Sequence, residues 1–181
     1  DVICVSVNDE IVHGIPRQNH ILRSGDIVGL DFGVTFRGMI TDAAITVIIG
    51  EASKEVQKLV SATRQSLEAG IDKVKAGVRV GDISAAVQSV LEKSKYGIIR
   101  DLVGHGVGHE LHEEPNIPNY GNSNSGSTLL AGMTVAIEPM ATLGGDKIKT
   151  DADGWTIRTQ DGSLSAHFEH TIAIVNGKPE I

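Results

Sequence analysis

Cysteine is almost missing from this sequence, and so are long apolar runs. Cys4 is the single cysteine in 181 residues, which excludes an internal disulfide framework and fits a reducing compartment. The most apolar stretch, residues 43–49, is far too short to cross a bilayer, and no basic and then apolar leader opens the chain. We therefore expect a soluble, cytoplasmic protein that is neither secreted nor membrane-bound.

The sequence also lacks an excess of basic residues. Its formal charge is −7 and its pI about 5.4, which argues against nucleic acid or an anionic membrane as the main ligand because both attract basic surfaces. A small neutral or cationic partner fits better. The 40% of hydrophobic and 22% of charged residues are typical of globular proteins, and the length predicts one domain or two half-sized repeats.

Two β-rich runs, residues 26–34 and 39–49, predict a hairpin. If its turn is centred just after Phe36, Asp31 and Asp42 face each other across the strands, with Cβ atoms roughly 4.5 to 5.5 Å apart. Two carboxylates this close in apolar surroundings repel each other and lose hydration, and a cation between them resolves both problems. Exposed aspartates or a slipped register are the alternative.

The remaining pattern predicts an α+β domain built around an antiparallel sheet. Apolar residues recur at helical spacing over residues 54–74, after Ser53 as N-cap, and again from Asp82, as N-cap, to Gly97. Both helices are amphipathic, so we expect them to cover the sheet. The second half repeats this order loosely, with turns and then strands in three stretches: residues 119–127, 133–141 and 166–175.

Three further side chains extend the candidate metal site. Glu138 and Glu169 each lie in a strand-like apolar run, where acidic residues are rarely buried without a partner. His105, between Gly104 and Gly106, adds a nitrogen donor on a loop whose backbone can approach other groups closely. Four carboxylates and one imidazole form a hard, oxygen-rich set, which favours Mn, Fe, Co or a similar divalent ion over a cysteine-bound zinc.

The histidine- and glycine-rich residues 104–112 do not fit two better-known motifs. His109 and His112 are three positions apart, whereas the helical zinc-protease motif needs four, with a glutamate second. His105 and His109 have the right spacing, but three glycines in this stretch make a helix improbable. The glycines also miss the dinucleotide-binding spacing.

Eight short motifs occur in order along the chain: His13-Gly14-Ile15-Pro16, Gly25-Asp26-Ile27-Val28 leading to Asp31, Thr41-Asp42, Gly104-His105-Gly106-Val107-Gly108, His112-Glu113-Glu114-Pro115, Gly132-Met133-Thr134 leading to Ile137-Glu138-Pro139-Met140, Asp153-Gly154-Trp155-Thr156 and Ser165-Ala166-His167-Phe168-Glu169-His170-Thr171. Together they resemble the bacterial-type methionine aminopeptidases over nearly the whole chain. The resemblance implies the pita-bread fold, an antiparallel sheet covered by helices with pseudo-duplicated halves. It also implies a single catalytic metallopeptidase domain, residues 1–181, that lacks the family's N-terminal segment.

The same resemblance implies an activity and a ligand set. The expected enzyme removes the N-terminal methionine from nascent proteins and peptides, and two divalent ions (Co, Mn, Fe, Ni or Zn) activate the water that hydrolyses the first peptide bond. By resemblance, Asp42 and Glu169 bridge the ions, Asp31 completes one shell, and His105 and Glu138 complete the other. The expected partner is a peptide N-terminus, with no direct nucleic acid binding, and the chain is expected to be a monomer.

The resemblance also implies roles around the ions. Glu138 is expected to carry the proton, His112 to stabilise the oxyanion, and His13 to contact the scissile region or help carry a proton. The residues expected to contact substrate are Cys4, His13, Leu111, His112 and Trp155. Leu111 departs from the many relatives that have an aromatic residue there, which changes the shape of the pocket.

Two other readings compete with this one. Another enzyme of the same fold, such as an X-Pro aminopeptidase or a creatinase-like hydrolase, shares the five ligands, but the short chain and the motifs at His13 and Trp155 argue against it. A non-catalytic binding module is disfavoured because all five ligand positions are present, and so are the two candidate catalytic histidines, His13 and His112. The other four histidines are expected to be structural or surface residues: His20, His109, His167 and His170.

Overall fold

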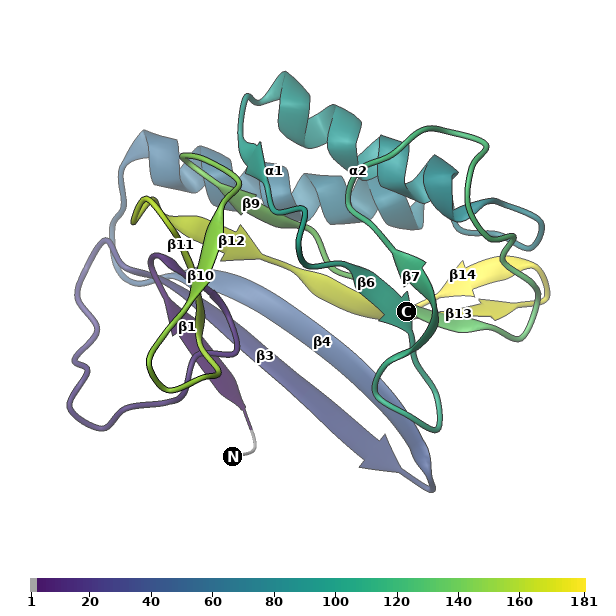
Figure 1. The fold of residues 1–181 in the computed structure, drawn as a ribbon, viewed down its shortest axis with the longest axis horizontal. Coiled ribbons are helices and arrows are strands. Elements are labelled where there is room, and N and C mark those ends of the chain that lie inside the picture. Colours follow the sequence, from purple (N-terminus) through teal and green to yellow (C-terminus); the bar gives the residue numbers. More distant parts are fainter. Residues whose placement is uncertain (1–2) are drawn as a thin grey trace.

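The computed structural model describes residues 3–181, which form two helices, one eight-stranded sheet and two three-stranded sheets, with all strand pairs antiparallel (Figure 1). This confirms the predicted α+β class. In spatial order, the large sheet contains β1 (Cys4–Val7), β3 (Ile27–Phe36), β4 (Met39–Ile48), β13 (Glu169–Val175), β8 (Thr134–Ile137), β6 (Gly104–Gly106) and β7 (Glu113–Ile117), while β14 (Lys178–Glu180) pairs with β13. The small sheets are β10 (Ile148–Thr150), β11 (Ile157–Thr159) and β2 (Glu10–Val12), and β12 (Ser165–His167), β9 (Met140–Thr142) and β5 (Gly97–Ile98).

The β3–β4 hairpin forms as predicted, but its register differs. The loop contains only Arg37 and Gly38, with φ of 51° and 81°, a two-residue turn with both central residues left-handed. Consequently Asp31 lies opposite Ala44, and Asp42 lies opposite Gly33, so the predicted direct pairing of the two aspartates is wrong. The shift is two residues, which keeps both aspartates on the same face as diagonal neighbours, a spacing of about 7 to 8 Å.

Helix α1 (Lys54–Ile71) begins where the sequence indicates. The hydroxyl of Ser53 accepts a hydrogen bond from the Val56 amide at 3.3 Å, which confirms the N-cap. The helix ends three residues earlier than predicted, because the chain turns there through hydrogen bonds from Lys73 and Val74 to carbonyls near its end.

Helix α2 (Val80–Lys93) differs from its prediction at both ends. Arg79 is the N-cap, and Asp82 instead accepts a hydrogen bond from the Arg79 amide at 3.3 Å from inside the first turn. The helix ends before Lys95, whose φ of 61° is incompatible with continuing it, and not at Gly97, which belongs to β5. Within residues 3–181, neither helix is long and apolar enough to cross a membrane.

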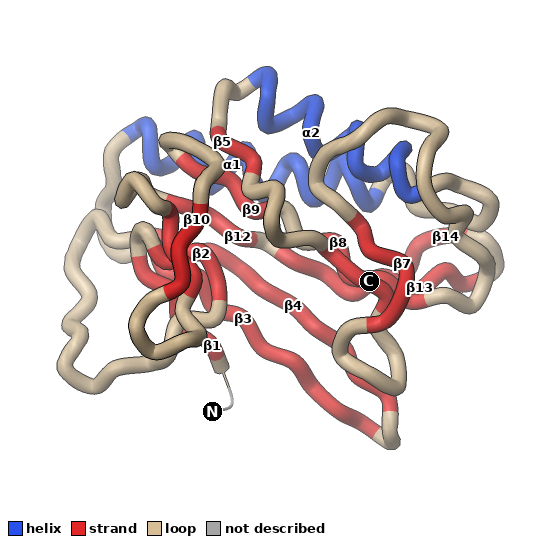
Figure 2. Tube along the Cα trace, in the orientation of Figure 1, coloured by secondary structure: helices blue, strands red, loops and turns tan. Residues whose placement is uncertain are grey.

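Both helices lie together on one side of the strands (Figure 2). The main core fills the space between them and the large sheet, with Leu59 and Ile83 from the helices and Ile137 and Ile172 from the strands all fully buried. Successive residues of a strand point to opposite faces, so Glu169, which is an odd number of positions from Ile172, lies on the face turned away from the helices.

Two predicted strands are each divided in the structure. The run 133–141 becomes β8 and β9, separated by Glu138 and Pro139, and the run 166–175 becomes β12 and β13, separated by Phe168. Pro139 has no amide hydrogen for a ladder, and its carbonyl accepts instead from Phe168. Glu138 therefore lies at a break between two strands. The prediction that it lies inside a strand is wrong.

His105 also lies in a different element from the one predicted. It belongs to strand β6 and pairs with Ala136 of β8. Its glycine neighbours permit this because a Cβ on Gly104 would collide with the Ala136 carbonyl, and one on Gly106 with the Glu114 carbonyl. The glycines that suggested a loop therefore allow close strand packing.

Candidate metal centre

The first row of donors runs straight across the large sheet. Asp31 of β3 lies opposite Ala44 of β4, and Ala44 lies opposite Glu169 of β13. Continuing the pairing of β13 with β8 by one residue brings Glu138 beside Glu169. Opposed residues of antiparallel strands share a face, so these three carboxylates lie on one side of the sheet.

A second row lies next to the first. Asp42 is two residues from Ala44 and therefore shares its face. The backbone of Asp42 is bonded to the hydroxyl of Thr171, Thr171 lies opposite Ala136, and Ala136 lies opposite His105. The sheet thus brings together all five side chains that the sequence selected as ligands.

The atoms of these side chains are close enough to share a cation. Asp42, His105 and Glu169 each offer a ligand atom within 4.8 Å of the others. Nε2 of His105 is 3.5 Å from Oε1 of Glu138 and 3.9 Å from Oε1 of Glu169. Ligands held about 2.1 Å from one ion lie roughly 3 to 3.5 Å apart. The distance from His105 to Glu138 meets that range, and the longer ones would shorten as the side chains close on an ion.

His105 is oriented as a ligand requires. Its Nδ1 lies 2.9 Å from the carbonyl of Gly106. Because a carbonyl can only accept, Nδ1 carries the hydrogen, and Nε2 is left with a lone pair directed at the carboxylates. The ring is buried, so this orientation is protected from competing water.

The crowding of carboxylates disturbs their ionisation. Burial raises the pKa of Asp31 to about 6, and the charges of Asp42 and Glu138 add to the rise while His167 opposes it. Burial, followed by Glu138, Asp42 and Asp31, raises the pKa of Glu169 well above its usual range. Within residues 3–181, Oε1 of Glu169 has no hydrogen-bond partner. A bound divalent cation would offset the repulsion between the carboxylates and would give Oε1 of Glu169 a partner. The set of donors fits such an ion.

The two predicted catalytic histidines lie at the edge of this centre. The ring of His112 packs edge-on against His105, with centroids 4.4 Å apart. His13 has a φ of 60°, and its ring lies 5.6 Å from that of Trp155. Burial lowers the pKa of His13, although the carboxylate of Glu138 works against that change.

The predicted substrate-contacting residues surround the same place. Cys4 of β1 lies directly opposite Asp31, and burial raises the pKa of its thiol. Leu111, 39% exposed, reaches over Gly33, which is the residue opposite Asp42. Trp155 is 58% exposed, so a large apolar surface is available beside His13.

His167 is at the site, although residue patterns predicted only a structural or surface role for it. Its side chain is 4% exposed, and Nε2 lies 3.6 Å from Oε2 of Glu138. A signal was present, because His167 precedes Glu169 by two positions and alternate residues of an extended chain share a face. By contrast, His109 is exposed, and His170 lies opposite Ile137 on the helix-covered face.

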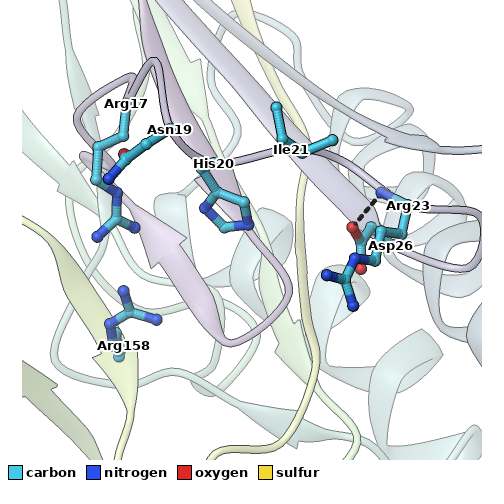
Figure 3. A pocket seen from close by; sticks show the side chains of 7 residues that line it. All are labelled: Arg17, Asn19, His20, Ile21, Arg23, Asp26 and Arg158. Atoms are coloured by element: carbon cyan, nitrogen blue, oxygen red, sulfur yellow. Dashed lines mark hydrogen bonds between the residues drawn. The ribbon is translucent and has the colours of Figure 1, made fainter.

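A separate cavity of about 680 Å³ lies beside the loop that precedes β3 (Figure 3). Arg158 there is bound to the carboxylates of Asp9, Glu10 and Asp151, and Arg17 is bound to Glu10. The positive charges of Arg158 and Arg17 are therefore largely neutralised by carboxylates of the protein itself. The residues that line it are Arg17, Asn19, His20, Ile21, Arg23, Asp26 and Arg158, a set that includes none of the candidate ligands among the described residues.

Comparisons with known proteins agree with the geometry. Residues 1–176 match the model of metallopeptidase family M24. The methionine aminopeptidase of Clostridium acetobutylicum is 47% identical over 179 residues, which cover 99% of this chain and 72% of the relative. Methionine aminopeptidase 1 of Bacillus subtilis is 48% identical over 172 residues, covering 95% and 69%. The crystal structure of the methionine aminopeptidase from Thermotoga maritima superposes with a TM-score of 0.96 at 49% identity, covering 99% of this chain and 72% of that one.

Proposed function

The chain belongs to metallopeptidase family M24, and we propose that it is an aminopeptidase that removes the N-terminal methionine of peptides and nascent proteins. The observation that carries the proposal is the convergence of Asp42, His105 and Glu169 within 4.8 Å on one sheet face. The similarity to methionine aminopeptidases at 47% and 48% identity supports the choice of substrate.

We propose that the centre holds two divalent ions, drawn from Mn, Fe, Co, Ni and Zn. The order of donors across the sheet supports this number. Asp42 and Glu169 come from the two central strands, β4 and β13, with Asp31 on one side and with Glu138 and His105 on the other. The central carboxylates are therefore placed to be shared, while the outer donors complete one ion each.

Divalent ions bound there would lower the pKa of a water molecule and polarise the peptide carbonyl. Glu138, beside His105 at the edge of the ligand set, is placed to hold a proton taken from the attacking water and would give it to the leaving amine. His112, packed on His105, donates a hydrogen bond to the developing oxyanion. His13, whose lowered pKa keeps it neutral near pH 7, contacts the scissile region.

The methionine side chain is proposed to lie among Cys4, Leu111 and Trp155, next to His13. Because Cys4 lies opposite Asp31, a substrate whose side chain packs there has its free amine near that end of the donor row, as an exopeptidase requires. We further propose that the enzyme acts in the cytoplasm, where nascent N-termini arise, and that it acts as a monomer.

The test is anaerobic reconstitution of metal-free protein with each of the five ions, followed by an assay on the tripeptide Met-Ala-Ser and on an Xaa-Pro peptide. We expect cleavage of Met-Ala-Ser and loss of both ion retention and turnover in Asp42→Asn. A folded protein that is inactive with every ion would favour a binding module. Preferential cleavage of the Xaa-Pro peptide would favour the dipeptidases of the same fold.

A further inference from the structure

Hydrogen bonds hold the backbone of His167 on two sides, which simple packing in the core does not require. Its amide donates to the hydroxyl of Thr46 at 2.9 Å, and that hydroxyl donates to the carbonyl of His167 at 2.7 Å. On its other side, β12 pairs His167 with Met140 of β9. Thr46 and Met140 are themselves buried, so the backbone that carries the imidazole is held from both sides.

The imidazole nitrogen at the end of this side chain is nevertheless unsatisfied. Nε2 of His167 is buried and has no hydrogen-bond partner within the part of the chain that the structure describes. Buried polar atoms are almost always paired, and an exception in a folded protein calls for a ligand, a water or a functional contact. The acceptor that lies in front of Nε2 is Oε2 of Glu138, 3.6 Å away.

Glu138 therefore lies between two imidazoles, one for each oxygen. Oε1 faces Nε2 of His105 at 3.5 Å, and Oε2 faces Nε2 of His167 at 3.6 Å. The second gap exceeds hydrogen-bonding distance by roughly half an ångström, which a small rotation of the Glu138 side chain removes. Glu138 needs such support because it lies at the break between β8 and β9, outside any strand.

We propose that His167 is a positioning residue, which donates a hydrogen bond from Nε2 to Oε2 of Glu138 and so directs Oε1 toward the ion shared with His105. The inference rests on the proposed function, since it gives Glu138 its tasks as ligand and proton carrier. When a hydrogen bond holds one oxygen of a carboxylate, the other oxygen is held in one orientation toward the metal. Loss of such a hydrogen-bond partner changes metal affinity or activity by about 10- to 100-fold.

Three substitutions separate this role from a merely structural one. His167→Gln keeps a donor at nearly the place of Nε2, His167→Asn keeps the polarity but is too short to reach Glu138, and His167→Leu fills the volume without a donor. The matched control is His170→Leu, which makes the same change three residues away on the opposite face of the sheet.

Two measurements are made on each variant: calorimetric titration of metal-free protein with Mn²⁺, and kcat and KM of the loaded enzyme on Met-Ala-Ser. In His167→Leu and His167→Asn we expect the ion shared by Glu138 and His105 to bind about 10- to 100-fold less tightly and kcat to fall by a similar factor, with KM and the number of ions unchanged. His167→Gln should restore both, and His170→Leu should match the wild type. If His167→Leu fails to fold, His167→Asn carries the test.

Two results would overturn the inference. One is wild-type affinity and kcat in folded His167→Leu or His167→Asn. The other is loss of one bound ion in all three His167 variants, which would make His167 a ligand. A wild-type enzyme that binds Mn²⁺ but cleaves no methionyl peptide would instead contradict the proposed function, while the titrations would still decide the role of His167.

Discussion

The hydroxyl of Thr171 makes two hydrogen bonds to the backbone of Asp42, accepting from its amide at 2.8 Å and donating to its carbonyl at 2.7 Å. Regular pairing of β4 with β13 is limited to Ala43 with His170 and Ala44 with Glu169. The side chain of Thr171 thus takes over the role of the ladder at the next position, which is the one that carries a bridging candidate.

Substitution of Thr171 should therefore affect both stability and ion binding. In Thr171→Val the Asp42 amide and carbonyl lose their partner, and we expect a loss of about 1 to 3 kcal/mol in the free energy of unfolding, together with weaker ion binding. Thr171→Ser retains the hydroxyl and should remain close to the wild type. Urea denaturation of the metal-free protein and a Mn²⁺ titration measure the two effects, and equal results for Val and Ser would contradict this account.

Glu169→Gln is expected to have opposite effects with and without metal. Without ions, the variant removes a buried carboxylate that its neighbours and its burial already disfavour as a charged group, so the metal-free protein should melt at the same or a higher temperature. With ions, the variant loses a ligand that we propose to bridge them, and retention and turnover should fall by more than the roughly 100-fold expected of an outer partner. Calorimetric melting with and without Mn²⁺ measures both. A variant that is destabilised without metal would argue against crowded charge at this site.

The stability of the metal-free protein should depend on pH through Asp31. The folded protein holds this proton more tightly than the unfolded chain, with a pKa of about 6 against an ordinary 3.8. Stability from this group is therefore present at low pH and is lost as the pH rises from about 4 to about 6, by at most about 3 kcal/mol and by less because the side chain is partly hydrated.

Asp31→Asn provides the control for that pH dependence. It removes the titrating group, so the difference between wild type and variant in urea denaturation should change across this range and be constant above it. Parallel curves for the two proteins between pH 4 and 7 would rule out a raised pKa at Asp31.

Gly14 should matter for catalysis without being required for ion binding. Its amide donates to the hydroxyl of Ser6 at 3.0 Å, its carbonyl accepts from Val5 at 2.8 Å, and a Cβ at this position would collide with the Val5 carbonyl. Gly14→Ala must therefore displace His13, the neighbouring residue, and we expect kcat on Met-Ala-Ser to fall by about 10-fold or more with Mn²⁺ affinity retained.

The control for Gly14→Ala is Gly132→Ala. Gly132 has a φ of 89° with open space around it, so the substitution costs stability through the backbone but lies away from His13. A loss of kcat in Gly132→Ala as large as in Gly14→Ala would show that the effect is general destabilisation.

Residue patterns predicted much of this fold because they depend on local chemistry. The N-cap at Ser53 and the hairpin of β3 and β4 follow from side-chain hydrogen bonding and from β propensity, and both are present. The register was missed because Arg37 adopts a left-handed conformation, which its residue type does not indicate. The sheet face of each aspartate was nevertheless correct, since a two-residue shift preserves alternation.

The environment of the centre was harder to predict than its members. The types and order of the donors along the chain selected five candidate ligands, Asp31, Asp42, His105, Glu138 and Glu169, and the sheet brings their side chains to one face. Contacts between distant segments determine that the strands break at Glu138 and that His105 lies in a strand. The proximity of His167 to Glu138 depends on those same contacts, and a pattern within one strand does not contain them.

The order of donors across the sheet also has a consequence during synthesis. Asp31 and Asp42 leave the ribosome on one hairpin, but Glu169 belongs to β13, more than 120 residues later, and the row of carboxylates across the large sheet is incomplete until β13 has joined it. A chain in which β13 has not yet paired therefore offers a cation only part of the final set of ligands. Ion capture therefore follows the insertion of β13 between β4 and β8, and a bound metal ion stabilises the sheet in which that insertion has taken place.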